Sequence, residues 1–173
     1  YLRDPANSVA FRAFQFANHA ILLQQIATSR PTREYDFDIS EQNFSYSTAL
    51  EENNVEDVPQ NRGKWRPFQI AFIVMVLPSI AKGSDEWREI VELIWFPTGG
   101  GKTEAYLAAA SFSMFFRRFK DNNDNGTEVI MRYTLRLLTA QQFQRATALI
   151  CAMEYLRSQN EKELGAEEFS IGI

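Results

Sequence analysis

The chain has 173 residues, of which 45% are apolar, and a formal net charge of −4. This length fits one domain, and the weak acidic excess means that any contact with nucleic acid must come from a local arrangement of residues. The single Cys151 excludes an internal disulfide and a cysteine-rich zinc site, and the single His19 excludes a histidine-based metal cluster. The longest apolar run, residues 70–77, is too short to span a bilayer, and no signal peptide is apparent. We therefore expect a cytoplasmic protein without a membrane partner.

The first third of the chain divides into two segments of different composition. Residues 1–30 are predicted to be an N-terminal helical segment, with a helix at about 9–30. Its predicted apolar face runs through Phe11, Phe14, Asn18 and Ile21. Residues 31–61 are predicted to be an acidic connector, because residues 34–58 contain eight acidic side chains and no Lys or Arg. A solvated connector is the favoured interpretation, and an acidic mimic that blocks a basic nucleic-acid groove is the alternative.

The remaining residues, 62–173, have more regular patterns. Periodic apolar residues predict helices at 66–81, 103–120 and 139–158, and the last is opened by a capping-box pattern from Thr139. Apolar runs predict buried strands at 91–96 and 128–133, and a further strand begins at 169–173. The first two strands are about 35 residues apart, which suits one crossover through a helix. We therefore expect an α/β fold with a parallel sheet and flanking helices.

The most informative motif is the run from Pro97 to Thr103, which reads Pro-Thr-Gly-Gly-Gly-Lys-Thr and lies between a predicted strand and a predicted helix. Glycines allow successive backbone N–H groups to turn toward a polyphosphate, and the helix N-terminus adds the positive end of its dipole. In such a loop Lys102 would contact the β- and γ-phosphates, and the hydroxyl of Thr103 would hold Mg²⁺. The predicted phosphate-binding residues are Thr98, Gly99, Gly100, Gly101, Lys102 and Thr103. The alternative is a glycine-rich turn that happens to precede Lys-Thr.

Two further motifs narrow the class of P-loop protein. In Arg66-Pro-Phe-Gln69, the amide of Gln69 can pair with the N6 amino group and N7 of adenine, which would select ATP over GTP. The segment from Met131 to Gln142 follows the second predicted strand, where open α/β sheets bind their ligands. Its hydroxyl and guanidinium groups suit nucleic-acid phosphates. Taken singly, each motif could also be an ordinary solvated helix start or polar loop.

The order of the three motifs resembles the Q motif, motif I and motif Ia of superfamily 2 helicases. Leu93–Leu107 and Met131–Ala146 are most similar to the large helicase of bacterial DISARM phage-defence systems, and residues 14–24 resemble the segment that precedes its helicase core. This resemblance implies that residues 62–173 are the first, incomplete part of a RecA-like P-loop NTPase domain. It implies ATP and Mg²⁺ as cofactors and nucleic-acid contacts at Thr134, Arg136 and Gln141. Two positions depart from the usual sequences of these motifs: Phe96 at the start of motif I, and Thr134-Leu-Arg in motif Ia.

The activity implied by the resemblance is that of an ATP-dependent helicase or translocase, acting on DNA in antiphage defence beside other subunits of the system. Hydrolysis needs an acidic Mg²⁺ ligand and a group that orients water. No Asp-Glu-x-x box at the end of a predicted strand follows Lys102 in this sequence. We therefore expect these 173 residues to bind nucleotide at most weakly, with catalysis in a longer protein. The alternatives are another P-loop NTPase or kinase, in which Arg-Pro-Phe-Gln has no role, and a non-catalytic interaction module with a vestigial P-loop.

Overall fold

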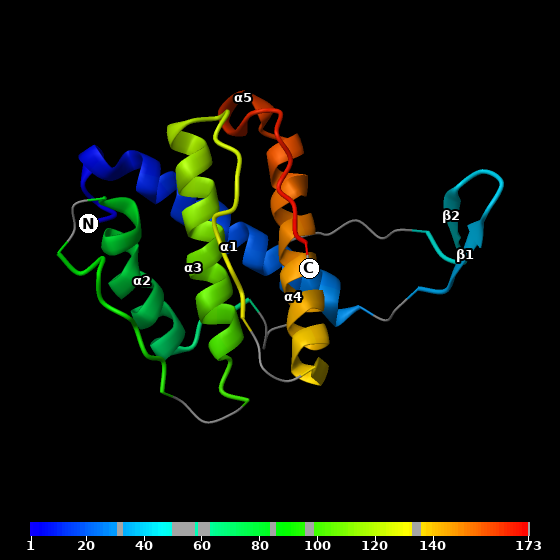
Figure 1. The fold of residues 1–173 in the computed structure, drawn as a ribbon, viewed down its shortest axis with the longest axis horizontal. Coiled ribbons are helices and arrows are strands. Elements are labelled where there is room, and N and C mark those ends of the chain that lie inside the picture. The colour runs from blue at the N-terminus through cyan, green and yellow to red at the C-terminus, as the bar shows by residue number, and fades with distance from the viewer. Residues whose placement is uncertain are drawn as a thin grey trace.

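Helices form most of the regular structure of this chain (Figure 1). The computed structural model describes residues 1–30, 33–49, 58, 63–83, 86–95, 99–132 and 136–172. Its helices are η1 (Pro5–Asn7), α1 (Ser8–Ser29), α2 (Pro67–Ala81), α3 (Lys102–Lys120), α4 (Arg136–Ser158) and α5 (Glu161–Leu164). Its strands are β1 (Tyr35–Asp38) and β2 (Asn43–Tyr46).

Helix α1 crosses behind α3 and α4 and shares one apolar core with them (Figure 1). Ala13 and Ala17 on α1 are almost fully buried, and such small side chains allow close approach of neighbouring helices. The ring of Phe16 lies 5.4 Å from that of Phe115 on α3 in an edge-to-face arrangement. The predicted face of α1 is wrong at Phe11, which is 44% exposed. The buried side of α1 is marked by its alanines together with Phe16 and Ile21.

The helices predicted at 9–30, 66–81 and 103–120 are confirmed by α1, α2 and α3. Helix α2 packs on α3 and contributes Ile73 and Leu77 to the core. Helix α4 begins at Arg136, earlier than predicted, so Thr139 lies inside the helix and is not its cap. Leu149 and Met153 of α4 are buried, as its apolar stripe predicts.

The predicted parallel sheet is wrong. Residues 91–95, 128–132 and 169–172 form no strand, and in the described ranges the only sheet is the antiparallel pair of β1 and β2. Val91 and Trp95 are 92% and 87% exposed. A buried parallel strand needs neighbouring strands at its edges and helices over its faces, and among the described residues 91–95 have neither. The α/β, partial RecA-like assignment is therefore corrected to a helical bundle with a separate hairpin.

The β1–β2 hairpin lies inside the predicted acidic connector and extends away from the helices (Figure 1). Tyr35 pairs with Tyr46, and Phe37 with Phe44, so four aromatic side chains share one face of the hairpin. The acidic side chain of Asp36 lies on the other face, opposite Ser45. All residues from 34 to 49 are exposed, in agreement with a solvated segment.

Two buried arginines attach α5 and the C-terminal segment to the bundle. Arg118 of α3 donates hydrogen bonds to the carbonyl oxygens of Leu164 and Glu167. Arg157 of α4 donates to the carbonyl oxygen of Gly165 at 2.8 Å and pairs with Glu154 at 2.6 Å. Burial, and then the nearby Arg157, lower the pKa of Arg118 below its ordinary value. The paired carboxylates and carbonyls satisfy the charges that the fold buries.

Candidate nucleotide-binding site

The glycine loop directly precedes α3. Gly99 and Gly101 have φ angles of 79° and 85°, a left-handed conformation that glycine adopts without a steric penalty. Gly101 is the N-cap of α3, so Lys102 and Thr103 occupy the first turn of that helix. Thr98, with Phe96 and Pro97, lies outside the described residues. The described part of the predicted loop therefore runs from Gly99 into the N-terminus of α3.

Two side chains at the start of α2 hold carbonyl oxygens of this loop. Arg66 donates from Nη1 to the oxygen of Gly100, and Gln69 donates from Nε2 to the oxygen of Gly101, both at 2.7 Å. In a trans peptide the carbonyl and the following N–H point in opposite directions. The N–H groups of Gly101 and Lys102 are therefore directed away from these two side chains. That orientation is the one that an anion-binding loop at a helix N-terminus requires.

Gln69, the predicted adenine-reading residue, has both ends of its amide engaged within the protein. Its Oε1 accepts a hydrogen bond from the backbone N–H of Arg66 at 2.8 Å, which completes a capping box. Its Nε2 is bonded to Gly101, and the residue is only 5% exposed. Adenine recognition stays a prediction. The contacts present in this structure are those of a side chain that positions the glycine loop.

The first turn of α3 is joined to α4 by two polar contacts. The hydroxyl of Tyr106 lies 3.3 Å from Oγ1 of Thr103 and 3.1 Å from Oε1 of Gln142. Glu104 pairs with Arg145 of α4, with 3.3 Å between Oε1 and Nη1. The predicted site residues do not include Glu104, Tyr106, Gln142 or Arg145. The spacing of three residues between Thr103 and Tyr106 is typical of contacts on one helix face, whereas no local pattern indicates the contacts with α4.

The predicted nucleic-acid-binding residues lie at or before the start of α4. Thr134 is outside the described residues, and Arg136 is the first residue of α4, with a side chain that the structure does not describe. Gln141 is exposed on α4, next to Gln142, whose side chain reaches Tyr106. The structure thus places the residue after Gln141 in contact with the helix that follows the glycine loop.

Comparison with known proteins finds a relative that covers almost the whole chain. The chain is 38% identical over 178 residues to the DISARM protein DrmA of Bacillus paralicheniformis. The chain is related to this DISARM protein. The match covers 99% of the chain and therefore includes the glycine loop, but the chain spans only 14% of the length of DrmA. No family model and no solved structure matches.

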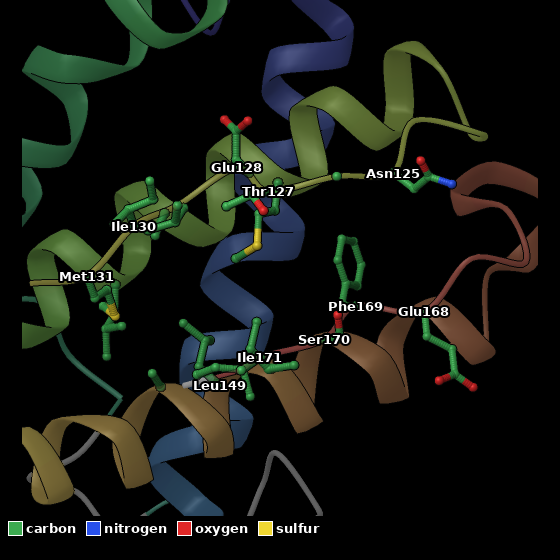
Figure 2. Close-up of a pocket in the computed structure, with 18 of the residues that line it drawn as sticks. Asn125, Thr127, Glu128, Ile130, Met131, Leu149, Glu168, Phe169, Ser170 and Ile171 are labelled. Carbon is green, nitrogen blue, oxygen red and sulfur yellow. The ribbon is translucent and has the colours of Figure 1, made fainter.

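A groove of about 1240 Å³ in this relative of DrmA lies away from the predicted site residues. It runs between α3, α4 and two extended segments, 124–131 and 167–172. Figure 2 shows Met131 and Ile130 on one side of it, and Phe169 and Ile171 on the other. At one end Arg117 pairs with Asp124 at 2.5 Å, and this hydrogen bond lowers the pKa of Asp124. The lining is mainly apolar and includes none of the predicted site residues.

The described residues contain no group of three or more His, Cys, Asp or Glu side chains that could hold a metal ion. Thr103 alone could supply a hydroxyl ligand to a Mg²⁺ ion held mainly by phosphate oxygens and water, an arrangement that Mg²⁺ favours. None of the helices in these ranges combines the length and apolarity needed to cross a membrane.

Proposed function

We propose that this chain contains the nucleotide-binding part of an ATP-dependent nucleic-acid motor, a helicase or translocase that acts on DNA in bacterial phage defence. The order of its three motifs and its similarity to the DISARM protein DrmA support this proposal. The observation that carries it is the orientation of the glycine loop. Arg66 and Gln69 hold two loop carbonyls, so the N–H groups of Gly101 and Lys102 are directed to the opposite side of the loop, where the N-terminus of α3 favours an anion.

In this proposal the phosphates of ATP bind at residues 99–103. Lys102 contacts the terminal phosphates and Thr103 contributes its hydroxyl to Mg²⁺, which would neutralise phosphate charge. The carboxylate of Glu104 lies in the same helical turn, where it would repel phosphate. Its ion pair with Arg145 at 3.3 Å offsets that charge. The N-terminal half of α3 is therefore electrostatically compatible with a bound polyphosphate.

Hydrolysis is assigned to the whole protein and nucleotide binding to this part of it. Phosphoryl transfer needs an acidic Mg²⁺ ligand and a group that positions the attacking water. The described residues contain no cluster of acidic side chains beside Thr103 that could serve. The chain spans 14% of DrmA, so the proposal places these groups elsewhere in a protein of that kind.

A binding experiment on the chain tests this function. A fluorescent ATP analogue is titrated with Mg²⁺ into the wild type, Lys102→Ala and Lys162→Ala, the last a control because Lys162 is exposed on α5. Loss of a charge-assisted contact from Lys102 should weaken binding by about ten- to a hundredfold, and the control should bind like the wild type. Equal binding by Lys102→Ala, or no binding by the wild type, would refute the proposal.

The DNA-binding part of the proposal needs its own measurement. Anisotropy of a labelled single-stranded oligonucleotide is measured with the wild type, Gln141→Ala and Gln159→Ala. Both glutamines are exposed, and Gln159 directly follows the end of α4. We expect Gln141→Ala alone to weaken binding, and the wild-type affinity to fall as salt is raised because phosphate contacts dominate. An affinity that is insensitive to salt and to both substitutions would argue against a DNA partner.

A further inference from the structure

The carboxylate of Glu104 lies at the end of the glycine loop. Glu104 is in the first turn of α3, and a Cβ on the N-cap residue Gly101 would lie 3.5 Å from its Oε2. An acidic side chain at this position of a helix commonly turns back toward the N-cap, near the positive end of the dipole. The chain therefore places a negative charge of its own beside the loop at which the phosphates of ATP are proposed to bind.

The other carboxylate oxygen of Glu104 is held by an arginine of α4. Nη1 of Arg145 lies 3.3 Å from Oε1 of Glu104, across a separation of 41 residues. The side chain of Glu104 is 24% exposed and that of Arg145 is 48% exposed, so water screens this pair only in part. The charge beside the glycine loop thus depends on a side chain of another helix.

The effect of the pair on a bound polyphosphate follows from the signs of its charges. Glu104 and Arg145 together contribute no net charge. Without Arg145, an unpaired carboxylate remains beside the loop and repels phosphate. Without Glu104, an unpaired guanidinium remains and attracts phosphate. Salt screens both effects, because much of the pair is in contact with water.

We propose that Arg145 is a positioning residue of the nucleotide site, which sets the affinity for polyphosphate by holding and neutralising the carboxylate of Glu104. This inference rests on the proposed function. Arg145 acts through Glu104 and needs no contact with the nucleotide. Because Arg145 belongs to α4 and Glu104 to α3, a displacement of α4 would change the charge beside the loop. Nucleotide affinity is in this way linked to the position of α4.

A double-mutant cycle tests the role of Arg145. The affinity for a fluorescent ATP analogue is measured for the wild type, Arg145→Ala, Glu104→Gln and the double variant. We expect Arg145→Ala to weaken binding by about two- to fivefold, the effect of one unpaired charge near a helix terminus. Glu104→Gln, which can still turn back to the N-cap, should bind at least as tightly as the wild type. The double variant, which has neither charge, should return to within about twofold of the wild type.

The ion pair of Arg12 and Glu163 is the matched control. It joins α1 to α5 with 3.0 Å between Nη2 and Oε1, its side chains are comparably exposed, and α5 lies beside the other end of α3 (Figure 1). Arg12→Ala and Glu163→Gln should bind the nucleotide like the wild type. Arg145→Lys, which keeps the positive charge, should also retain most of the affinity. The loss in Arg145→Ala relative to the wild type should shrink as NaCl is raised, because salt screens the repulsion by Glu104.

The double variant separates the possible roles of Arg145. If Arg145 contacts phosphate itself or only supports the fold, the double variant will bind as weakly as Arg145→Ala, and the inference is overturned. If the wild type binds nucleotide through Lys102 and Arg145→Ala binds equally well, the inference is overturned while the proposed function stands. If the wild type does not bind nucleotide, the proposed function fails and this inference fails with it.

Discussion

Gln69 donates a hydrogen bond across 2.7 Å to the carbonyl oxygen of Gly101, 32 residues later in the chain. The same side chain accepts the N–H of Arg66, so one amide fixes both the start of α2 and the end of the glycine loop. The approach is close enough that a Cβ on Gly101 would lie 2.7 Å from Nε2 of Gln69. Gly101 therefore depends on Gln69 for its position. Gln69 in turn depends on the absence of a Cβ at Gly101 for the space that its amide occupies.

Gln69→Leu should weaken the binding of ATP and GTP alike. The substitution removes the hydrogen bond to Gly101, and the loss of one such bond corresponds to about three- to tenfold in affinity. Titrations with both nucleotides measure it, with Gln15→Leu on the exposed side of α1 as the control. A loss confined to ATP would contradict the positioning role and indicate that Gln69 reads adenine directly.

Gly101→Ala should disrupt nucleotide binding more than Gly99→Ala does. Both glycines have positive φ, so alanine at either position has a backbone cost of about 1–2 kcal/mol. Only at Gly101 does the added methyl group also collide with Gln69, because nothing lies within 4 Å of a Cβ at Gly99. Comparing the two affinities separates backbone strain from loss of the contact. Equal losses would show that the contact with Gln69 is unimportant for binding.

Gly165→Ala should lower the free energy of unfolding by at least about 2 kcal/mol. Gly165 has a φ of 78° and a ψ of 176°, which is almost exclusive to glycine, and a Cβ there would overlap the carbonyl oxygen of Asn122. Urea unfolding followed by circular dichroism measures the change. Gly83→Ala is the control, because its Cβ would meet nothing within 4 Å and should change stability by less than about 0.5 kcal/mol. Similar stabilities for the two variants would contradict this packing.

Glu154→Gln should reduce stability at neutral pH and flatten its pH dependence. The hydrogen bond from Arg157 and the one from the N–H of Phe169 lower the pKa of Glu154 below its ordinary value of 4.5. A carboxyl whose pKa is lower in the folded state stabilises the fold at pH values above its ordinary pKa of 4.5. This contribution is lost as the pH falls through the pKa of the folded state. We expect a loss of about 1–3 kcal/mol at neutral pH from the weakened contacts.

Urea unfolding at neutral pH and below the ordinary carboxyl range measures this effect. The wild type should lose stability between the two conditions, and Glu154→Gln should lose less. Glu89→Gln, at an exposed position, is the control and should follow the wild type. A variant as sensitive to acid as the wild type would show that the acid sensitivity arises from other carboxylates.

The helices of this protein could be predicted from the sequence, but its sheet could not. Helix formation depends on neighbours three and four residues away, and that periodicity is present in α1 to α4. An apolar run such as 91–95 indicates only that a segment favours burial. A strand also needs the backbone of a partner, which lies outside the run. The hairpin did have a local signal, since Tyr35-Asp-Phe-Asp38 alternates with period two, but its acidic composition favoured a connector.

The candidate site was predictable to the extent that it is one continuous motif. The glycines, Lys102 and Thr103 are adjacent in sequence, and the structure places Gly99 to Thr103 together at the start of α3. Arg66 contacts the loop across a separation of 34 residues, and Tyr106 contacts Gln142 across 36. Such contacts result from how the helices pack, and packing geometry is not contained in the spacing of residues along one helix.

The chain contacts α1 again at residues 63 and 65, beyond the β1–β2 hairpin. After the hairpin, the N–H of Gly63 bonds to Oε1 of Gln25 at 3.1 Å, and Nε1 of Trp65 bonds to Oδ1 of Asn18 at 2.6 Å. The chain thus returns alongside the helix that it left at Ser29, and the shared core of the described bundle draws no residue from 33–48. Residues 33–48 are therefore a natural insertion point, where a reporter domain or a short linker could replace the hairpin while the helices keep their packing.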